Sequence, residues 1–311
     1  MSSKKAMTEY KTETLEHLGL VSSMVDELGI VDTIDNEIKQ DKNERKVTIG
    51  EAVKAMILNG LGFANRQLYL VPQFFENKPL DILIKEGIEP NNLNDTVLGR
   101  ALDSLYDFGV TPLFSLISTQ AFENLDLVAK YHHLDSTAIH VDGKYNSDEE
   151  PEEGVVHITK GHSKDHRPDL NQVMLEMICE NSHGIPLAMR ALNGNSSDKI
   201  SFEKMIVDHV DAIKKTTTGT VVADSAVYTA KNIKSFKINN IKWVTKVPHQ
   251  IKDTKYLMQS LTIERMTPHS KDERYSYISF GNSYADVNQH WIVVQALLHL
   301  PWVYKHLKIG I

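Results

Sequence analysis

The spacing of apolar residues changes near residue 130. Before this point apolar residues recur three and four positions apart, which is the stripe of a helix lying on a core. Three segments show this spacing: Val25–Ile38, Ile49–Leu61 and Thr96–Phe108. Thr48 stands at a helix start, and Asn94 or Asp95 can cap the third segment. We therefore predict a helical N-terminal domain over residues 1–126, serving DNA binding or dimerisation.

From Tyr131 onward the residues favour strands, with helical segments only later. Six strands are predicted: His133–Val141, Val155–Thr159, Leu170–Cys179, Ile185–Leu192, Gly219–Ala223 and Ile241–Val247. Helices are predicted at Phe202–Ile213 and Ala226–Phe236. Consecutive strands followed by alternating helix and strand suit a mixed sheet flanked by helices. This α/β order predicts a ribonuclease-H-like core over residues 127–248.

Composition and charge narrow the function classes. The 311 residues allow about two domains, and the net charge of −7 excludes a wholly basic nucleic-acid binder. Residues 231–255 nevertheless hold seven lysines and one acid, a local basic segment. The single cysteine, Cys179, excludes an internal disulfide and a cysteine-based zinc site. Without a signal peptide or a spanning apolar run, we expect a cytoplasmic protein with no membrane partner.

Two aspartates stand out in the predicted sheet. Asp135 lies inside an apolar strand and Asp224 ends another. Aspartate is disfavoured within strands, and an unpaired buried carboxylate is costly, so a shared divalent cation is one explanation. Mg²⁺ takes one or two carboxylates together with water and phosphate oxygens. The plainer alternative is that Asp135 caps a turn and Asp224 caps the following helix.

The segment between residues 160 and 172 is polar and basic. It holds Lys160, His162, Lys164 and Arg167 beside Gly161. Lysine and arginine contact phosphates well, and glycine permits close backbone approach. We interpret this segment as a phosphate or nucleic-acid contact, with a solvated hairpin as the alternative.

Histidines cluster near the first aspartate. They are His132, His133, His140, His157, His162 and His166. No helical HExxH pattern accompanies them, and His133 and His140 fall on opposite strand faces, so polar pairing or substrate contact is favoured over zinc. Trp243 is read as a core residue, not as a platform for stacking bases.

Four sequence pieces together resemble one family. They are Leu134-Asp-Ser-Thr137, Gly161-His-Ser-Lys-Asp-His-Arg-Pro-Asp-Leu-Asn-Gln172, Gly194-Asn-Ser-Ser-Asp198 and Val222-Ala-Asp-Ser-Ala-Val-Tyr228. In this order and at these spacings they resemble DDE transposases of bacterial insertion sequences, in the insertion sequence four superfamily. The resemblance covers roughly residues 10–295.

The resemblance implies metal-dependent DNA transposition by cutting and pasting. Asp135 and Asp224 match the first two catalytic acids and would bind Mg²⁺ or Mn²⁺ in a two-metal site. The partners would be double-stranded DNA, at the terminal inverted repeats and at the target, and a second copy in a homodimer. Location would be the bacterial cytoplasm, at the nucleoid. Many members of the family insert a mostly β-domain after the second acid, and the basic segment from Lys231 onward, with Lys242 and Lys246, resembles its beginning and would contact DNA. Residues 249–311 would then hold the start of this β-rich insertion and an aberrant, truncated tail.

The third catalytic acid of the family has no counterpart in this sequence. The family places a glutamate in a Tyr-x2-Arg-x3-Glu-x6-Lys pattern, whereas Glu264 and Glu273 lie in strand-like context without the Tyr and Arg. After Gln295 the sequence resembles an out-of-frame tail. We therefore expect a truncated copy that is inactive alone. Two alternatives stay open: a non-catalytic DNA-binding or dimerising remnant that modulates full-length transposase, and an unrelated metal-dependent phosphohydrolase.

Overall fold

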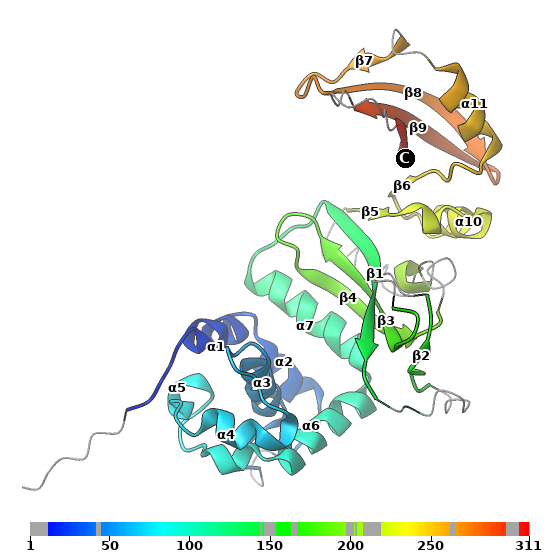
Figure 1. The fold of residues 1–311 in the computed structure, drawn as a ribbon. Helices are drawn as coiled ribbons and strands as arrows, with labels where there is room; N and C mark the ends of the chain where they lie inside the picture. The colour runs from blue at the N-terminus through cyan, green and yellow to red at the C-terminus, as the bar shows by residue number, and fades with distance from the viewer. Residues whose placement is uncertain are drawn as a thin grey trace, which may run out of the picture. The chain divides into compact units, whose positions relative to one another are not determined.

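The structure is a computed structural model, and its ribbon is drawn in Figure 1. It describes residues 12–41, 45–143, 145, 154–162, 167–196, 202, 204–207, 219–261, 265–296 and 305–310. The chain divides into two compact units, Met1–Leu127 (unit 1) and Val128–Ile311 (unit 2).

Unit 1 is built from helices. The α-helices are α1 (Leu18–Glu27), α2 (Ile30–Glu37), α3 (Ile49–Gly60), α4 (Val71–Phe75), α5 (Leu80–Leu83), α6 (Asp95–Phe108) and α7 (Val110–Asn124). Two short 3-10 helices, η1 (Leu68–Leu70) and η2 (Pro90–Leu93), connect them. The predicted starts are confirmed: the Thr48 side chain caps α3 in a capping box with Glu51, and Asn94 caps α6.

The predicted helix over Val25–Ile38 is wrong in one respect. The chain breaks between α1 and α2 at Gly29, whose φ of 70° is left-handed. Glycine adopts this conformation without the steric cost that a side chain brings. The apolar spacing continues through the break, so the two helices looked like one.

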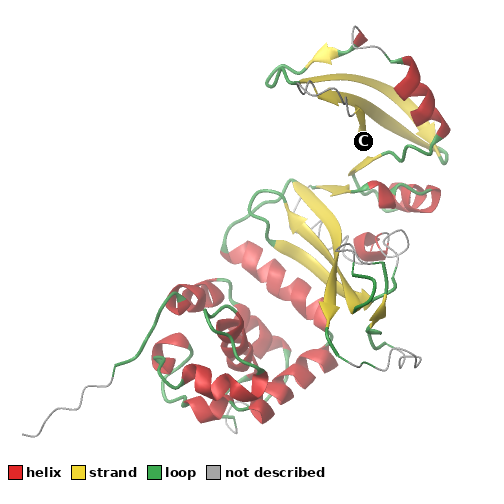
Figure 2. Cartoon of the chain, viewed as in Figure 1, coloured by secondary structure: helices red, strands yellow, loops and turns green. Residues whose placement is uncertain are grey.

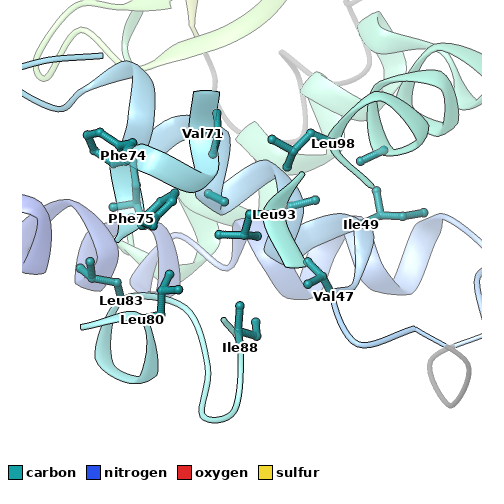
Figure 3. Packing of buried hydrophobic residues seen from close by; sticks show 14 of the residues in the cluster. Val47, Ile49, Val71, Phe74, Phe75, Leu80, Leu83, Ile88, Leu93 and Leu98 are labelled. Carbon is teal, nitrogen blue, oxygen red and sulfur yellow. The ribbon is translucent and has the colours of Figure 1, made fainter. Parts of the chain in front are cut away.

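The core of unit 1 gathers apolar side chains from most of these helices. Figure 3 shows part of this cluster, including Val71, Phe75, Leu93 and Leu98, each completely buried. Helices α2 and α3 pack so closely at Gly50 that an added Cβ would press on the Val31 carbonyl oxygen. Burial of such a cluster is the main favourable term in folding.

Unit 2 carries the strands of the chain. They are β1 (Tyr131–Val141), β2 (Thr159–Lys160), β3 (Asn171–Glu180), β4 (Pro186–Asn193), β5 (Thr220–Ala223), β6 (Trp243–Lys246), β7 (Thr267–Pro268), β8 (Tyr275–Tyr284), β9 (Val287–Ala296) and β10 (Lys305–Gly310). Helices α10 (Ala230–Ile238) and α11 (Lys252–Ser260) and the 3-10 helix η3 (Ser225–Val227) lie between them in sequence. Figure 2 colours these strands yellow.

The strands form one sheet in the order β2-β3-β1-β5-β6-β10-β9-β8-β7, with β4 pairing β3. Strand β1 is antiparallel to β3 and parallel to β5, and β5 is parallel to β6. The core order is therefore β4-β3-β1-β5-β6. This confirms the predicted mixed α/β sheet with the strand order of a ribonuclease-H-like core. Of the predicted helix Phe202–Ile213, residues 202 and 204–207 are helical, and the others lie outside the described residues.

The last strands extend the same sheet. Strands β8 and β9 form a hairpin whose turn residues, Ala285 and Asp286, have φ of 54° and 62°, as a tight primed turn requires. Strand β10 pairs antiparallel with both β6 and β9. It thereby connects the core strands to the hairpin.

None of the helices that the structure describes has the length and apolar character needed to cross a lipid bilayer.

Candidate active site at the ends of β1 and β5

The register of two parallel strands brings Asp135 and Asp224 together. Leu134 on β1 lies beside Ala223 on β5, and each aspartate is the next residue of its chain. The backbone of Asp224 is still extended, with φ −73° and ψ −176°. Adjacent strands lie ~4.8 Å apart, and residues side by side project to the same face. The two carboxylates, called the aspartate pair below, are therefore neighbours on one face of the sheet.

The aspartate pair is exposed, which corrects the expectation of buried carboxylates. Strand β1 alternates, with His132, Leu134 and Ser136 buried and Asp135 exposed between them. Asp224 is exposed as well. The apolar neighbours that suggested burial point to the opposite face, because successive side chains alternate along a strand. The cost of burying a carboxylate therefore does not apply to this pair, and what remains is the proximity of two negative charges.

Each aspartate also accepts a local backbone hydrogen bond. Oδ1 of Asp135 accepts from the Ser136 N–H at 2.8 Å, and Oδ1 of Asp224 accepts from the Ala226 N–H at 2.7 Å. The alternative role of Asp224 as a helix cap is therefore present in η3. Capping and a place beside Asp135 are compatible, because a carboxylate has two oxygens.

A polar residue missed by the sequence analysis holds the backbone at Asp224. The buried Thr245 hydroxyl on β6 donates to the Asp224 carbonyl oxygen. The signal available in the sequence was a threonine on the same strand face as Trp243, which alternation assigns to the core. Trp243 itself is buried, which confirms its assignment to the core.

A cleft of about 560 Å³ opens beside Asp224. Its lining includes Asp224, Lys246, His249, Tyr228 and Tyr284. Lys246 ends β6 and Asp224 ends β5, so the cleft lies at the carboxyl ends of the parallel strands. Ligands of open α/β sheets bind at such an edge.

Tyr228 couples this cleft to the β8–β9 hairpin. Its hydroxyl donates to Gln289 Oε1 at 2.7 Å, and the Trp291 indole N–H donates to the same oxygen at 2.9 Å. The Tyr228 ring stacks on Tyr284 with centroids 4.9 Å apart. Burial raises the pKa of Tyr228, so its hydroxyl stays a neutral donor. The hairpin thus fixes the segment that follows Asp224.

Two motif glycines have a structural role. An added Cβ at Gly161 would overlap the Gly194 carbonyl, and one at Gly194 would overlap the carbonyl oxygens of Gln172 and Thr159. The buried Gln172 side chain donates to the Gly194 oxygen at 2.7 Å. Close backbone approach was expected at Gly161, but the partner is another part of the chain. Gly161, Gln172 and Gly194 are called the glycine clasp below.

The predicted basic contacts lie around this clasp and on β6. Lys160, His162 and Lys242 are exposed, whereas Lys246 is half-buried. Lys164 lies outside the described residues. Arg167 is exposed, and its guanidinium forms a two-pronged bond to Asp169 at 2.9 and 2.7 Å. The hydrogen bond from Arg167 holds the pKa of Asp169 at about 2.

The histidines near β1 divide between the two strand faces. His132 is buried, and desolvation lowers its pKa to about 4, so it is neutral in the fold. His133 and His162 are exposed, and His166 lies outside the described part of the chain. Within the described ranges, no group of three or more His, Cys, Asp or Glu side chains could hold a metal ion.

Glu273 lies in a turn before β8 and not in a strand, which corrects its predicted context. Glu264, the acidic loop 148–153 and residues 297–304 of the tail lie outside the described residues.

Comparison with known proteins gives a match of one family model to part of the chain and distant similarity to solved structures. Residues 10–119 match the family model of a domain of unknown function, DUF4277. The chain is similar to a piggyBac transposase in a synaptic complex with hairpin DNA, at 10% identity and a TM-score of 0.42, over 94% of this chain and 59% of that one. It is similar to the Mos1 transposase in a paired-end complex with the left transposon end, at 10% identity and a TM-score of 0.26, over 68% and 62% of the two chains. The chain thus spans about three fifths of each structure. Among curated proteins there is no match.

Proposed function

We propose that the chain acts in DNA transposition through metal-dependent phosphoryl transfer, with the aspartate pair as the metal-binding part of its site. The observation that supports this proposal most is the register of β1 and β5, which makes Asp135 and Asp224 neighbours on one sheet face. The family resemblance of the motifs around both residues supports the same reading.

The aspartate pair fits a hard divalent cation. It offers carboxylate oxygens, which Mg²⁺ and Mn²⁺ prefer, and its exposure leaves room for the water and phosphate oxygens that complete their shells. When bound, such an ion stabilises the charge that develops on phosphoryl oxygens and activates water.

The residues around the pair suit a phosphate-bearing substrate. Lys246 and His249 share the cleft with Asp224 and bring donors to it. Lys160, His162, Lys164, Arg167 and Lys242 are proposed as further contacts to double-stranded DNA. Arg167 would exchange its bond with Asp169 for a phosphate, since guanidinium binds both in the same geometry.

The proposal includes low activity of this chain by itself. Among the described residues no third acid joins the aspartate pair. Two carboxylates alone hold two metal ions poorly, so a glutamate from outside the described residues or from another chain would have to complete the site. The bacterial insertion element, the homodimer and a location at the nucleoid belong to the same proposal.

Manganese binding tests this function without depending on turnover. Mn²⁺ is titrated into the full chain, and the free ion is followed by electron paramagnetic resonance. We expect Asp135→Asn and Asp224→Asn each to weaken binding at least about tenfold, because each removes one charged ligand. Asp142→Asn, an exposed carboxylate just beyond β1, is the charge-matched control and should leave binding unchanged. Equal affinity in all four proteins would contradict the proposal.

The second candidate is a DNA-binding protein without catalysis. The absence of a third acid at the pair among the described residues favours it. Cleavage of a duplex carrying the element ends is the discriminating assay, with Mg²⁺ present and with the full chain alone. Tight duplex binding that is unchanged in Asp135→Asn, with no Mn²⁺ site and no cleavage, would favour this candidate over the first.

A further inference from the structure

Unit 1 contains a cavity of about 410 Å³, and the charged side chains that line it among the described residues are all basic. Arg45 and Lys46 enter it from the segment before α3, and Arg100 enters from the second turn of α6. Asn92 and Asn94 add neutral polar groups to the lining. Two adjacent cations and a third more than fifty residues further along the sequence therefore line the same cavity.

The backbone that directly follows Lys46 is held by core packing and by a helix cap. Val47, next to Lys46, is buried, and Figure 3 shows it near Ile49 and Leu93. Thr48 follows directly, and its N–H donates to Glu51 Oε2 at 2.9 Å while its hydroxyl accepts from the Glu51 N–H. Such a capping box fixes the start of a helix. The cavity is thus part of the packed domain and not an accident of loose side chains.

On the α6 side the Asn94 side chain accepts from the Val97 N–H at 3.1 Å, which fixes the start of that helix. Leu98, two residues before Arg100, is completely buried. Arg100 therefore projects from a helix that the core holds in place.

The cations of the cavity differ from three lysines of unit 1 that are paired with acids. Lys54 pairs with Asp26 at 2.6 Å, Lys78 with Glu16 at 3.4 Å and Lys85 with Glu51 at 3.0 Å. Arg45, Lys46 and Arg100 are exposed and make no ion pair with any described residue. Residues 1–130 carry a net charge of −7, so acids for pairing are plentiful. Because three positive side chains stay close together in a domain rich in acids, we infer that an anion from outside the chain binds between them.

We propose that this cavity binds the phosphate backbone of duplex DNA. Arginine, lysine and asparagine are the side chains that contact DNA phosphates, and such contacts position a protein on the duplex without reading its sequence. The choice of DNA over another polyanion rests on the proposed function of unit 2. The cavity thereby provides unit 1 with a DNA-binding site that does not depend on the metal site.

Fluorescence anisotropy with the full chain tests this site. The probe is a labelled 30-base-pair duplex of mixed sequence, titrated without divalent metal over a series of salt concentrations. The cavity variant is Lys46→Gln with Arg100→Gln. The control is Lys39→Gln with Arg66→Gln, which removes the same charge from exposed residues of unit 1 that do not line the cavity.

We expect the cavity variant to weaken binding at least about tenfold at low salt, and to reduce the slope of log K against log salt by about 2, since each phosphate contact contributes about 0.9. The control should keep the wild-type affinity and slope. Equal weakening in both variants would assign the effect to net charge and overturn the proposal, as would no change in the cavity variant or no duplex binding by the wild type.

The outcome is separable from the function of unit 2. If inorganic phosphate at millimolar concentration binds wild type but not the cavity variant, while duplex affinity is the same in both, the cavity is a small-anion site and the DNA proposal is wrong. Loss of Mn²⁺ binding in the aspartate variants is measured without DNA. Either site can therefore fail while the other stands.

Discussion

The aspartate pair and the glycine clasp come from the same set of motifs but have opposite surroundings. The pair is exposed, whereas the clasp is built around a buried glutamine and a backbone contact that excludes any side chain. The aspartate pair is accessible to a ligand, whereas the glycine clasp holds β2, β3 and the segment after β4 in close backbone contact. The specificity of a sequence motif therefore does not say whether its residues act on a substrate or hold the fold.

This difference gives two separate experimental signatures. Substitutions at Gly161 or Gly194 should lower the free energy of unfolding more than they weaken ligand binding, because an added side chain would overlap backbone atoms. Replacement of either aspartate of the pair by asparagine should reduce metal binding and leave stability nearly unchanged, because asparagine can accept the same local backbone hydrogen bond.

The largest effect is expected for Gly194→Ala. An added methyl group would overlap two backbone carbonyl oxygens, and backbone yields less readily than a side chain. We expect a loss of about 3 kcal/mol or more in the free energy of unfolding, measured by urea denaturation. Gly281→Ala on β8 is the matched control, because its Cβ would meet open space. A Gly194→Ala protein as stable as the control would show that no clasp exists.

A smaller effect concerns the buried face of β1 behind Asp135. His132 has a pKa of about 4 in the fold, below its ordinary value of 6.5, so between these values the unfolded chain binds more protons. Stability is therefore complete above about pH 6.5 and is lost as the pH falls toward 4, by about 3 kcal/mol in total. Urea midpoints at several pH values should show this dependence.

His132→Gln should remove that part of the pH dependence, and His290→Gln, at an exposed position, should keep it. If the His132→Gln protein retains the full slope between pH 6.5 and 4, the buried face does not depend on a neutral histidine.

The smallest effect concerns Arg167, which lies in the sequence between Gly161 and Gln172 of the glycine clasp. Asp169→Asn should release its guanidinium and raise duplex DNA affinity about two- to fivefold, with one more phosphate contact in the salt slope. Asp272→Asn is the control, because Asp272 binds Arg274 in the same two-pronged way, at 2.8 and 2.6 Å, and this hydrogen bond likewise holds its pKa at about 2. An equal gain in DNA affinity in both variants would show that net charge is the cause, and Arg167 would then not be a DNA contact.

Sequence reasoning found the sheet order and the two aspartates because both depend on local patterns. Period-two spacing marks strands, and their succession limits the topology. Parallel neighbours then place Asp135 and Asp224 side by side at one edge. Burial was judged wrongly because the apolar neighbours of Asp135 belong to the other face of β1.

Contacts between distant segments were beyond the sequence. Gly161 meets Gly194 only after β3 and β4 have paired. The basic cavity of unit 1 joins residues 45–46 to Arg100 through the folding of α3 against α6, inside a region whose overall charge is negative. The break at Gly29 was hidden because the apolar spacing runs through it.

Iron-directed backbone cleavage tests most directly whether the aspartate pair shares one ion. Fe²⁺ replaces Mg²⁺ in the full chain, ascorbate and peroxide are added, and the peptide fragments are identified by mass spectrometry. If the pair shares an ion, we expect cuts near both residue 135 and residue 224, prevented by excess Mg²⁺ and absent from both Asp135→Asn and Asp224→Asn. Cuts at one of the two positions only, or at both in either variant, would contradict a shared ion.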